Sequence, residues 1–297
     1  MSDSPQSRSV VCPGCGRVVA VDAPRCPGCG RRRPGLWGLA PALGRFGDRL
    51  RFTPIVLWGC ALLYLTTLLW EPEAIWRLGE DIGRGRIFSL LAPASKPLFL
   101  FGMSGRIPIF ELGRWWTVLS AGWLHGSVLH IALNLLWIRH LAPTVSRHFG
   151  AARLVILYTV SSAAGFLLTS TAALLPLPGP LSGASFTVGA SAPLFGLFGA
   201  LVLYGQRTGD RRMSRDFLQF VAIWVVIGVI ASSGGPTAIR IDNWAHLGGF
   251  AGGYLSARWL DPTRREDPRH VLAALLCLAA MALAIVASVV HGLRFVG

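Results

Sequence analysis

One uninterrupted apolar segment constrains the fold of this chain more than any other feature. From Thr53 the sequence reads TPIVLWGCALLYLTTLLW, 18 residues without a charged side chain. As an α-helix this segment is about 27 Å long, close to the thickness of the hydrocarbon core of a bilayer. Backbone polar groups find no water in that core, so such a segment crosses it as a helix. The sequence therefore predicts a membrane protein built from α-helices.

Six further apolar segments follow, and the composition agrees with them. Hydrophobic residues make up 53% of the chain and charged residues 14%, whereas about a quarter of the residues are charged in an average soluble domain. We therefore expect an all-α polytopic fold with seven transmembrane helices. Their predicted ranges are 53–70, 115–138, 154–175, 189–204, 217–233, 243–257 and 271–290.

The distribution of positive charge predicts how the chain lies in the membrane. The 28 basic and 14 acidic residues give a net charge of +14, which by itself would suggest binding to nucleic acid. However, 17 of the basic residues lie between the cysteine motifs and the first span or in the connections after spans two, four and six. Lys and Arg near span ends stay preferentially in the cytoplasm. We therefore expect a multi-pass protein of the plasma (inner) membrane with a cytoplasmic N-terminus, an outside C-terminus, attraction to anionic lipid and no nucleic-acid partner.

Two copies of one cysteine motif precede the first span. Cys12-Pro-Gly-Cys15 and Cys26-Pro-Gly-Cys29 are separated by ten residues. Each motif directs two thiolates at one point, and together they supply the tetrahedral shell of four sulfurs that Zn²⁺ prefers. The alternatives are a pair of disulfides or unrelated thiols, and a cytoplasmic location argues against disulfides. Four protein ligands leave no open position on the metal, so we expect a structural zinc ion.

Composition divides the chain into four predicted parts. The cysteine motifs define a cytoplasmic zinc-ribbon-like module, residues 1–35, which we hypothesise to dock a protein partner or to regulate the chain. A basic linker, 36–52, leads to a six-helix core, 53–260, and a cytoplasmic loop with the seventh transmembrane helix occupies 261–297. Residues 1–53 hold no apolar run long enough for the centre of a cleavable signal peptide, so we expect this segment to be retained.

Polar side chains within the spans are candidates for function, because burying them in hydrocarbon is costly. His130 and Asn134 lie four residues apart in span two and share one helical face. Ser191 begins span four, about 24 Å from its cytoplasmic end, and His246 lies about 18 Å from the cytoplasmic end of span six. Both side chains are thus at membrane depth, about one helical turn apart in level, and we expect a buried aqueous pocket around them.

Small residues allow spans four and six to approach each other closely. They form one stripe on the His246 face of span six, Gly249, Gly253 and Ala257, and another in span four, Gly196 and Ala200. Two backbones this close can bring a serine hydroxyl within about 2.6–3.2 Å of an imidazole, the geometry in which the imidazole acts as a general base.

The predicted chemistry is acyl transfer to water inside the membrane. Ser191 is the candidate nucleophile and His246 its base. The N-terminal end of a helix at Ser191 stabilises negative charge, and His130 and Asn134 are candidate donors to the oxyanion. We expect no cofactor for catalysis.

These segments together resemble the rhomboid family of intramembrane serine proteases. The resemblance covers about 50–290 and implies a six-helix rhomboid-like core with an additional seventh helix. It also implies a Ser191–His246 dyad without an acidic third member, an oxyanion steadied by His130 and Asn134, Phe195 packed on the histidine, and transmembrane segments of other proteins as substrates. The matching motifs are Gly189-Ala190-Ser191, Ala245-His246-x-x-Gly249-x-x-x-Gly253, His125 with His130-x-x-x-Asn134, and Gly-Arg114-Trp115-Trp116.

Two other classes of function stay open. Ala192 follows the candidate nucleophile where the family usually has glycine, so the alternative is a catalytically weak or inactive rhomboid-like binder or chaperone of membrane proteins. A transporter predicts inverted repeats and paired broken helices, and only one segment of this sequence looks broken. Ser185 lies in a second Gly-Ala-Ser copy, which we interpret as a loop. The intact serine and histidine favour the protease.

Overall fold

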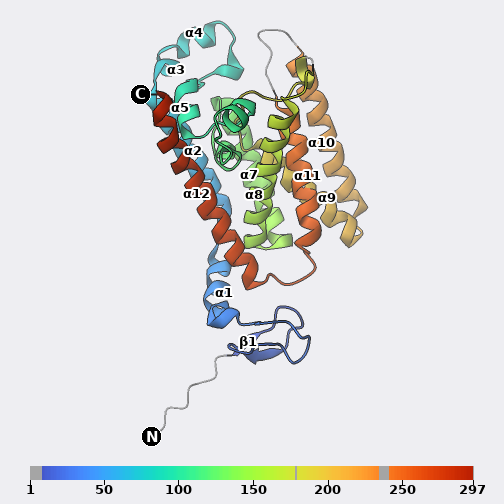
Figure 1. Ribbon diagram of the computed structural model, residues 1–297. Helices are drawn as coiled ribbons and strands as arrows, with labels where there is room; N and C mark the ends of the chain where they lie inside the picture. The colour runs from blue at the N-terminus through green and yellow to red at the C-terminus, as the bar shows by residue number, and fades with distance from the viewer. Residues whose placement is uncertain (1–8, 178, 234–240, 297) are drawn as a thin grey trace.

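The molecule has a small module at one end of a long helical bundle. The computed structural model describes residues 9–177, 179–233 and 241–296, so residues 1–8 of the predicted zinc-ribbon-like module lie outside the described residues. The module lies below the bundle in Figure 1, and the C-terminus lies at the opposite end, beside α5. This arrangement separates the cysteine motifs from the C-terminus by the full length of the bundle.

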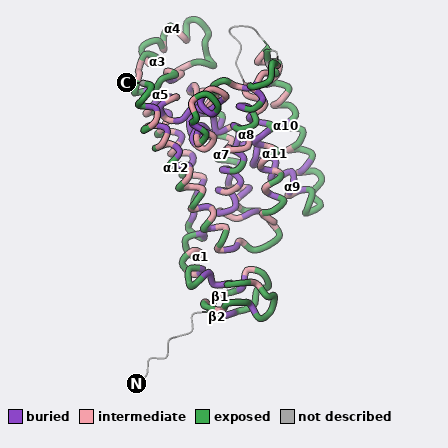
Figure 2. The backbone as a smooth tube through the Cα atoms, viewed as in Figure 1, coloured by how far each residue is buried: buried purple, intermediate pink, exposed green. Residues whose placement is uncertain are grey.

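The N-terminal module, which we call the ribbon (residues 9–34), has very little hydrophobic core. Strands β1 (Ser9–Val11) and β2 (Val18–Ala20) pair antiparallel. Its buried hydrophobic cluster consists of two cysteines and one valine. Figure 2 shows that most of its backbone belongs to exposed residues. So few buried apolar groups are insufficient to fold a unit of this size unaided, which is the usual situation of small metal-binding domains. A short segment, η1 (Leu36–Gly38), and helix α1 (Ala40–Arg49) connect it to the bundle.

Five of the described helices are long and apolar enough to cross a membrane. Large hydrophobic side chains on α10 and α12, such as Ile230 and Leu283, are exposed on their outer faces, where lipid rather than water would contact them. The prediction of an all-α polytopic membrane fold is thereby confirmed. The five helices are α2 (Phe52–Trp70), α7 (Val128–Phe149), α8 (Ala151–Ala172), α10 (Arg211–Ser232) and α12 (Pro268–Val296).

Two shorter helices occupy the predicted spans four and six. These are α9 (Ser191–Thr208) and α11 (Asn243–Trp259). Every residue of α9 from Ala192 to Leu203 is buried. A helix surrounded by other helices needs neither the length nor the uniform hydropathy of one that faces lipid. In the sequence, spans four and six are the least uniformly apolar of the seven, and the burial of α9 accounts for this in span four.

The predicted start of the second span is wrong by 13 residues, just over half of the predicted length. The prediction began this helix at residue 115, whereas α7 begins at Val128, where the Ser127 hydroxyl accepts a hydrogen bond from the His130 amide. The preceding residues form α6 (Thr117–Ser120) and η4 (Ala121–Trp123). Ala121, Trp123 and Leu124 are buried in protein. Hydropathy does not distinguish a segment that is buried in protein from one that is buried in lipid. This segment is apolar because it is buried in protein.

Short helices fill the remaining connections. Between α2 and α7 the chain also packs against the segment before α9, through an antiparallel bridge of Ser104 with Thr187. The short helices are α3 (Glu73–Trp76), α4 (Leu78–Gly83), η2 (Ile87–Ser89), α5 (Ser95–Phe101), η3 (Ile107–Glu111) and η5 (Gly179–Leu181).

Helices α9 and α11 approach each other at glycines. A Cβ atom at Gly253 would collide with the Gly196 carbonyl, and one at Gly249 would collide with the Ala192 carbonyl. One at Gly199 would collide with the backbone of Phe250. The small-residue stripes predicted from the sequence therefore form a direct backbone contact. That contact determines how far apart the side chains at the N-terminal ends of the two helices lie.

Candidate active site

The structure brings Ser191 and His246 together at the N-terminal ends of α9 and α11. The Oγ atom of Ser191 lies 2.8 Å from Nε2 of His246, which is hydrogen-bonding distance. His246 is 7% exposed, whereas Ser191 is half-buried. A hydroxyl bonded to a shielded imidazole has the arrangement that activates a serine as a nucleophile.

An aromatic ring, rather than a carboxylate, holds the histidine. The Phe195 ring stacks on the His246 ring with centroids 4.1 Å apart and planes within 5° of parallel. Among the described residues, no group hydrogen-bonds to Nδ1 of His246. Phe195 thus lies where the resemblance expects it, one turn after Ser191, and the ring orientation depends on packing.

Local backbone features place these two side chains. The Asp242 carboxylate accepts a hydrogen bond from the Ala245 amide at 3.0 Å and so begins α11 just before His246. Gly189 has a φ of 137°, a conformation that L-residues with a side chain rarely adopt. This glycine turns the chain into α9, so that Ser191 is its first residue. The nucleophile candidate is therefore at the positive end of a helix dipole.

His130 lies beside this turn. A Cβ atom at Gly189 would lie 2.7 Å from Nε2 of His130 and 3.6 Å from Oγ of Ser191. The Gly126 amide donates a hydrogen bond to Nδ1 of His130 at 3.4 Å. An acceptor at Nδ1 means that the neutral ring carries its proton on Nε2. His130 therefore presents an N–H donor on the side that faces Gly189.

Asn134 and His125 support His130. The Asn134 amide donates a hydrogen bond from Nδ2 to the His130 carbonyl at 2.9 Å, and its side chain is buried one turn further along the same face. The His125 ring lies edge-on to that of His130, with centroids 5.2 Å apart. The structure thus brings the four predicted catalytic and oxyanion residues and His125 together at one end of the bundle. The Asn134 side chain is hydrogen-bonded to the backbone of its own helix.

Sequence reasoning missed Gly165 of α8. A Cβ atom there would lie 2.8 Å from the methyl group of Ala192. That methyl packs in a buried cluster with Ala121, Phe166 and Ala245. The departure from the usual glycine after the nucleophile is therefore accommodated by a glycine on the facing helix. The run of small residues at 161–165 (SSAAG) was the available signal.

Arg114, which the sequence identified only as part of the Gly-Arg114-Trp115-Trp116 motif, is fully buried. Its guanidinium donates to the carbonyls of Phe99 and Ser288, at 3.0 and 2.9 Å. The indole N–H of Trp116 donates to the Ser288 hydroxyl at 3.1 Å. The segment before α6 is thus attached to α12 by two hydrogen bonds and to α5 by one.

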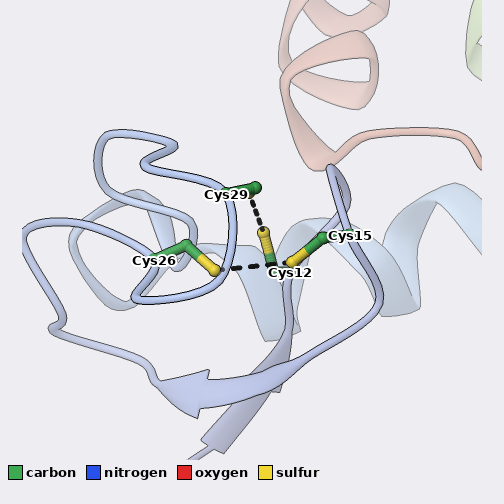
Figure 3. A group of neighbouring side chains, drawn as sticks. All are labelled: Cys12, Cys15, Cys26 and Cys29. Atoms are coloured by element: carbon green, nitrogen blue, oxygen red, sulfur yellow. Dashed lines mark hydrogen bonds between the residues drawn. The ribbon is translucent and has the colours of Figure 1, made fainter.

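The four cysteines of the ribbon converge on one point, as Figure 3 shows. Their sulfurs lie within 4.8 Å of one another, and Cys12 to Cys29 and Cys15 to Cys26 are each 3.6 Å apart. Zinc–sulfur bonds of about 2.3 Å in a tetrahedron place sulfurs about 3.8 Å apart, whereas a disulfide is about 2.05 Å long. The Gly28 amide donates to the Cys26 sulfur and lowers the pKa of this thiol to about 6. The spacing of the four sulfurs fits a zinc ion.

Comparison with known proteins supports these observations. A family model of the Rhomboid domain matches residues 112–262. The chain is 32% identical over 169 residues to RHOMBOID-like protein 7 of Arabidopsis thaliana, covering 56% of this chain and 49% of that protein. It is 30% identical to rhomboid protease GluP of Bacillus subtilis, covering 56% of this chain and 30% of that protein. It is 31% identical to rhomboid protease GlpG of Yersinia enterocolitica, covering 63% of this chain and 58% of that protein.

The chain thus spans between 30% and 58% of the length of these three relatives. The domain match covers just over half of the chain and contains both helices that carry the Ser191–His246 pair. The chain is therefore an integral, multi-pass membrane protein that belongs to the rhomboid family.

Proposed function

We propose that this protein is an intramembrane serine endopeptidase that hydrolyses peptide bonds in or near transmembrane segments of other membrane proteins. The observation that carries the proposal is the 2.8 Å contact between Oγ of Ser191 and Nε2 of His246. Two relatives, GluP and GlpG, are named as rhomboid proteases. The alternative, an inactive binder or chaperone, predicts no chemical use of this contact.

In the proposed mechanism, His246 accepts the Ser191 proton as Oγ attacks the carbonyl carbon of the scissile bond. The resulting oxyanion is stabilised by the N–H on Nε2 of His130 and by the N-terminal end of α9. His246 then delivers its proton to the departing amine, leaving an ester on Ser191. A water molecule, deprotonated by His246, hydrolyses this ester and restores the hydroxyl. No metal or cofactor takes part.

We further propose how the protein is oriented. With the ribbon in the cytoplasm of a plasma-membrane protein, the Ser191–His246 pair at the opposite end of the bundle faces a pocket that opens to the outside. The basic residues beside the ribbon-side span ends support this orientation. Structural Zn²⁺ is held by Cys12, Cys15, Cys26 and Cys29, and anionic lipid lies against the basic side.

Labelling with a fluorophosphonate tests the proposed function directly. Such a probe phosphonylates a serine hydroxyl only where a neighbouring base activates it. We expect labelling at Ser191 in the detergent-solubilised protein and its loss in His246→Ala, with the modified residue identified by mass spectrometry. If Ser191 stays unlabelled while the protein is folded, or if His246→Ala labels equally well, the binder or chaperone becomes the better explanation.

Substitution of His130 tests the oxyanion proposal. We expect His130→Ala to lower kcat by about 100-fold with little change in KM, because one donor to the transition state is lost. Cleavage kinetics with a reconstituted transmembrane substrate measure both constants. His130→Gln, which keeps an N–H donor, should recover part of the rate. Equal kcat for His130→Ala and the wild type would remove His130 from the mechanism.

Substitutions at Ala192 and Gly165 test whether these two residues share one space between α8 and α9. We expect Ala192→Gly to change kcat/KM by less than about threefold, because the methyl already has space. Gly165→Ala should lower the melting temperature, since its new methyl would lie 2.5 Å from the Ala245 carbonyl and 2.8 Å from the Ala192 methyl, and the double variant should recover only the part due to Ala192. Thermal unfolding of the four proteins provides the measurement. Strictly additive shifts would mean that the two positions do not share this space.

A further inference from the structure

The ribbon contacts the transmembrane bundle at the start of α12. The guanidinium of Arg31 forms an ion pair with the Asp267 carboxylate, whose side chain is 11% exposed. The guanidinium of Arg269 donates a hydrogen bond to the Arg32 carbonyl at 2.9 Å. Two charged groups of the α12 start thus hold two adjacent residues of the ribbon. The low exposure of Asp267 distinguishes this contact from a mobile surface ion pair.

The geometry of Arg31 and Arg32 depends on the second cysteine motif. Arg31 follows Cys29 by two residues, and its carbonyl accepts a hydrogen bond from the Cys26 amide at 2.8 Å. Arg32 is held in a bridge with Arg25, immediately before Cys26. The ribbon has almost no other core to preserve this geometry. Its fold, and with it the position of Arg31, therefore depends on metal bound by the four cysteines.

The part of the bundle that contacts the ribbon, residues 264–269, is held in place by its own hydrogen bonds. The Arg153 guanidinium donates to the carbonyls of Arg264 and Arg265, at 2.9 and 2.8 Å. The Glu266 carboxylate accepts a hydrogen bond from the Arg153 amide at 2.9 Å. Asp267 in turn accepts from the Arg269 amide at 3.0 Å and so begins α12. The carboxylate that meets the ribbon is thus fixed by the bundle, whereas its partner is fixed by the metal site.

From these contacts we propose that the ribbon is a metal-dependent clamp on the first turns of α12. Its docking partner is this chain's own seventh transmembrane helix. With zinc bound, Arg31 and Arg32 hold Asp267 and Arg269, and α1 packs beside them with Gly47 against Val271. Without zinc, the second cysteine motif loses its shape and the first turns of α12 are released. The exposed positions of Cys15 and Cys29 make the metal accessible from the cytoplasmic side.

Helix α12 also connects the ribbon to the opposite end of the bundle. The other end of this helix, at Ser288, is bonded to Arg114 and Trp116. Those residues lead into α6 and η4, where the Ala121 carbonyl accepts the Gly189 amide at 3.0 Å, two residues before Ser191. A contiguous set of contacts therefore joins the metal site to the candidate active site. The clamp itself is defined by protection of α12, so its test does not depend on proteolysis.

Hydrogen exchange on the full-length protein in lipid nanodiscs tests the clamp. The probe is zinc alone, added or removed with a strong chelator, and the readout is exchange of the backbone amides of residues 270–275. We expect chelation to accelerate this exchange by about tenfold in the wild type. Arg31→Met should accelerate it to a similar extent with zinc bound, and chelation should then add little.

Two further variants make the result specific. Asp267→Asn keeps a side chain that caps α12 but removes the charge, so it should behave as Arg31→Met does. Asp261→Asn is the matched control, because Asp261 pairs with Arg207 and Arg264 rather than with the ribbon. It should retain the full response to zinc. The clamp is refuted if chelation leaves the wild-type exchange unchanged, or if Arg31→Met responds to zinc as strongly as the wild type.

Discussion

Replacing Ser191 by alanine is expected to lower kcat/KM for a transmembrane substrate by about 10⁴-fold or more, because the attacking oxygen is lost. His246→Ala should have a comparable effect, since without a base the hydroxyl stays protonated. The double variant should be no slower than either single variant, because groups that act in one step are not additive. Cleavage of a reconstituted substrate, followed by gel or mass spectrometry, gives the rates.

The neighbouring Gly-Ala-Ser copy provides the matched control for this experiment. Ser185 is exposed, and its carbonyl accepts a hydrogen bond from the Ile107 amide at 3.3 Å. Ser185→Ala removes an equivalent hydroxyl six residues away and should leave cleavage unchanged. If Ser185→Ala abolished cleavage and Ser191→Ala did not, the nucleophile would have been assigned to the wrong copy.

The second large effect concerns stability. Gly253→Ala should lower the free energy of unfolding by about 3 kcal/mol, because the new methyl has no space against the Gly196 carbonyl and α9 and α11 must separate. Cleavage should fall as well, since the 2.8 Å contact between Ser191 and His246 depends on this separation. Thermal or denaturant unfolding in detergent measures the first quantity.

Gly44→Ala is the appropriate control for that substitution. Gly44 lies within α1 and has no atom within 4 Å of the position that a Cβ would occupy. The same chemical change should therefore be neutral or slightly stabilising there, by up to about 1 kcal/mol. Comparable losses at the two positions would show that the α9–α11 contact is more compliant than its geometry indicates.

The parts of the site that sequence analysis could predict were those encoded by spacing. Glycines four residues apart mark the contact face of α11, and a serine and a histidine at similar membrane depth mark the chemistry. These features are local, so one sequence is sufficient to read them. The Phe195 contact was expected from resemblance, and its parallel geometry required the structure.

The parts that could not be predicted arise from three-dimensional packing. The start of α7 differs from the prediction because apolar residues before it, such as Ala121, Trp123 and Leu124, are buried in protein and not in lipid. Gly165 accommodates Ala192 from another helix. Arg31 and Asp267 are 236 residues apart, and neither lies in a pattern that would suggest the other. Such contacts follow from the placement of whole elements, which hydropathy and motif spacing do not encode.

The parallel stack of Phe195 on His246 fixes the orientation of the imidazole before any substrate binds. A ring packed flat against another cannot turn edge-on unless α9 and α11 move apart, so its rotational freedom is lost when the helices assemble. The entropic cost of aligning Nε2 of His246 with Ser191 therefore arises once, when the protein folds. It does not arise again in each cycle of the proposed reaction. Replacing Phe195 by an aliphatic side chain would return rotational freedom to the imidazole, so the proposed peptide hydrolysis would become slower while the pattern of hydrogen bonds stayed unchanged.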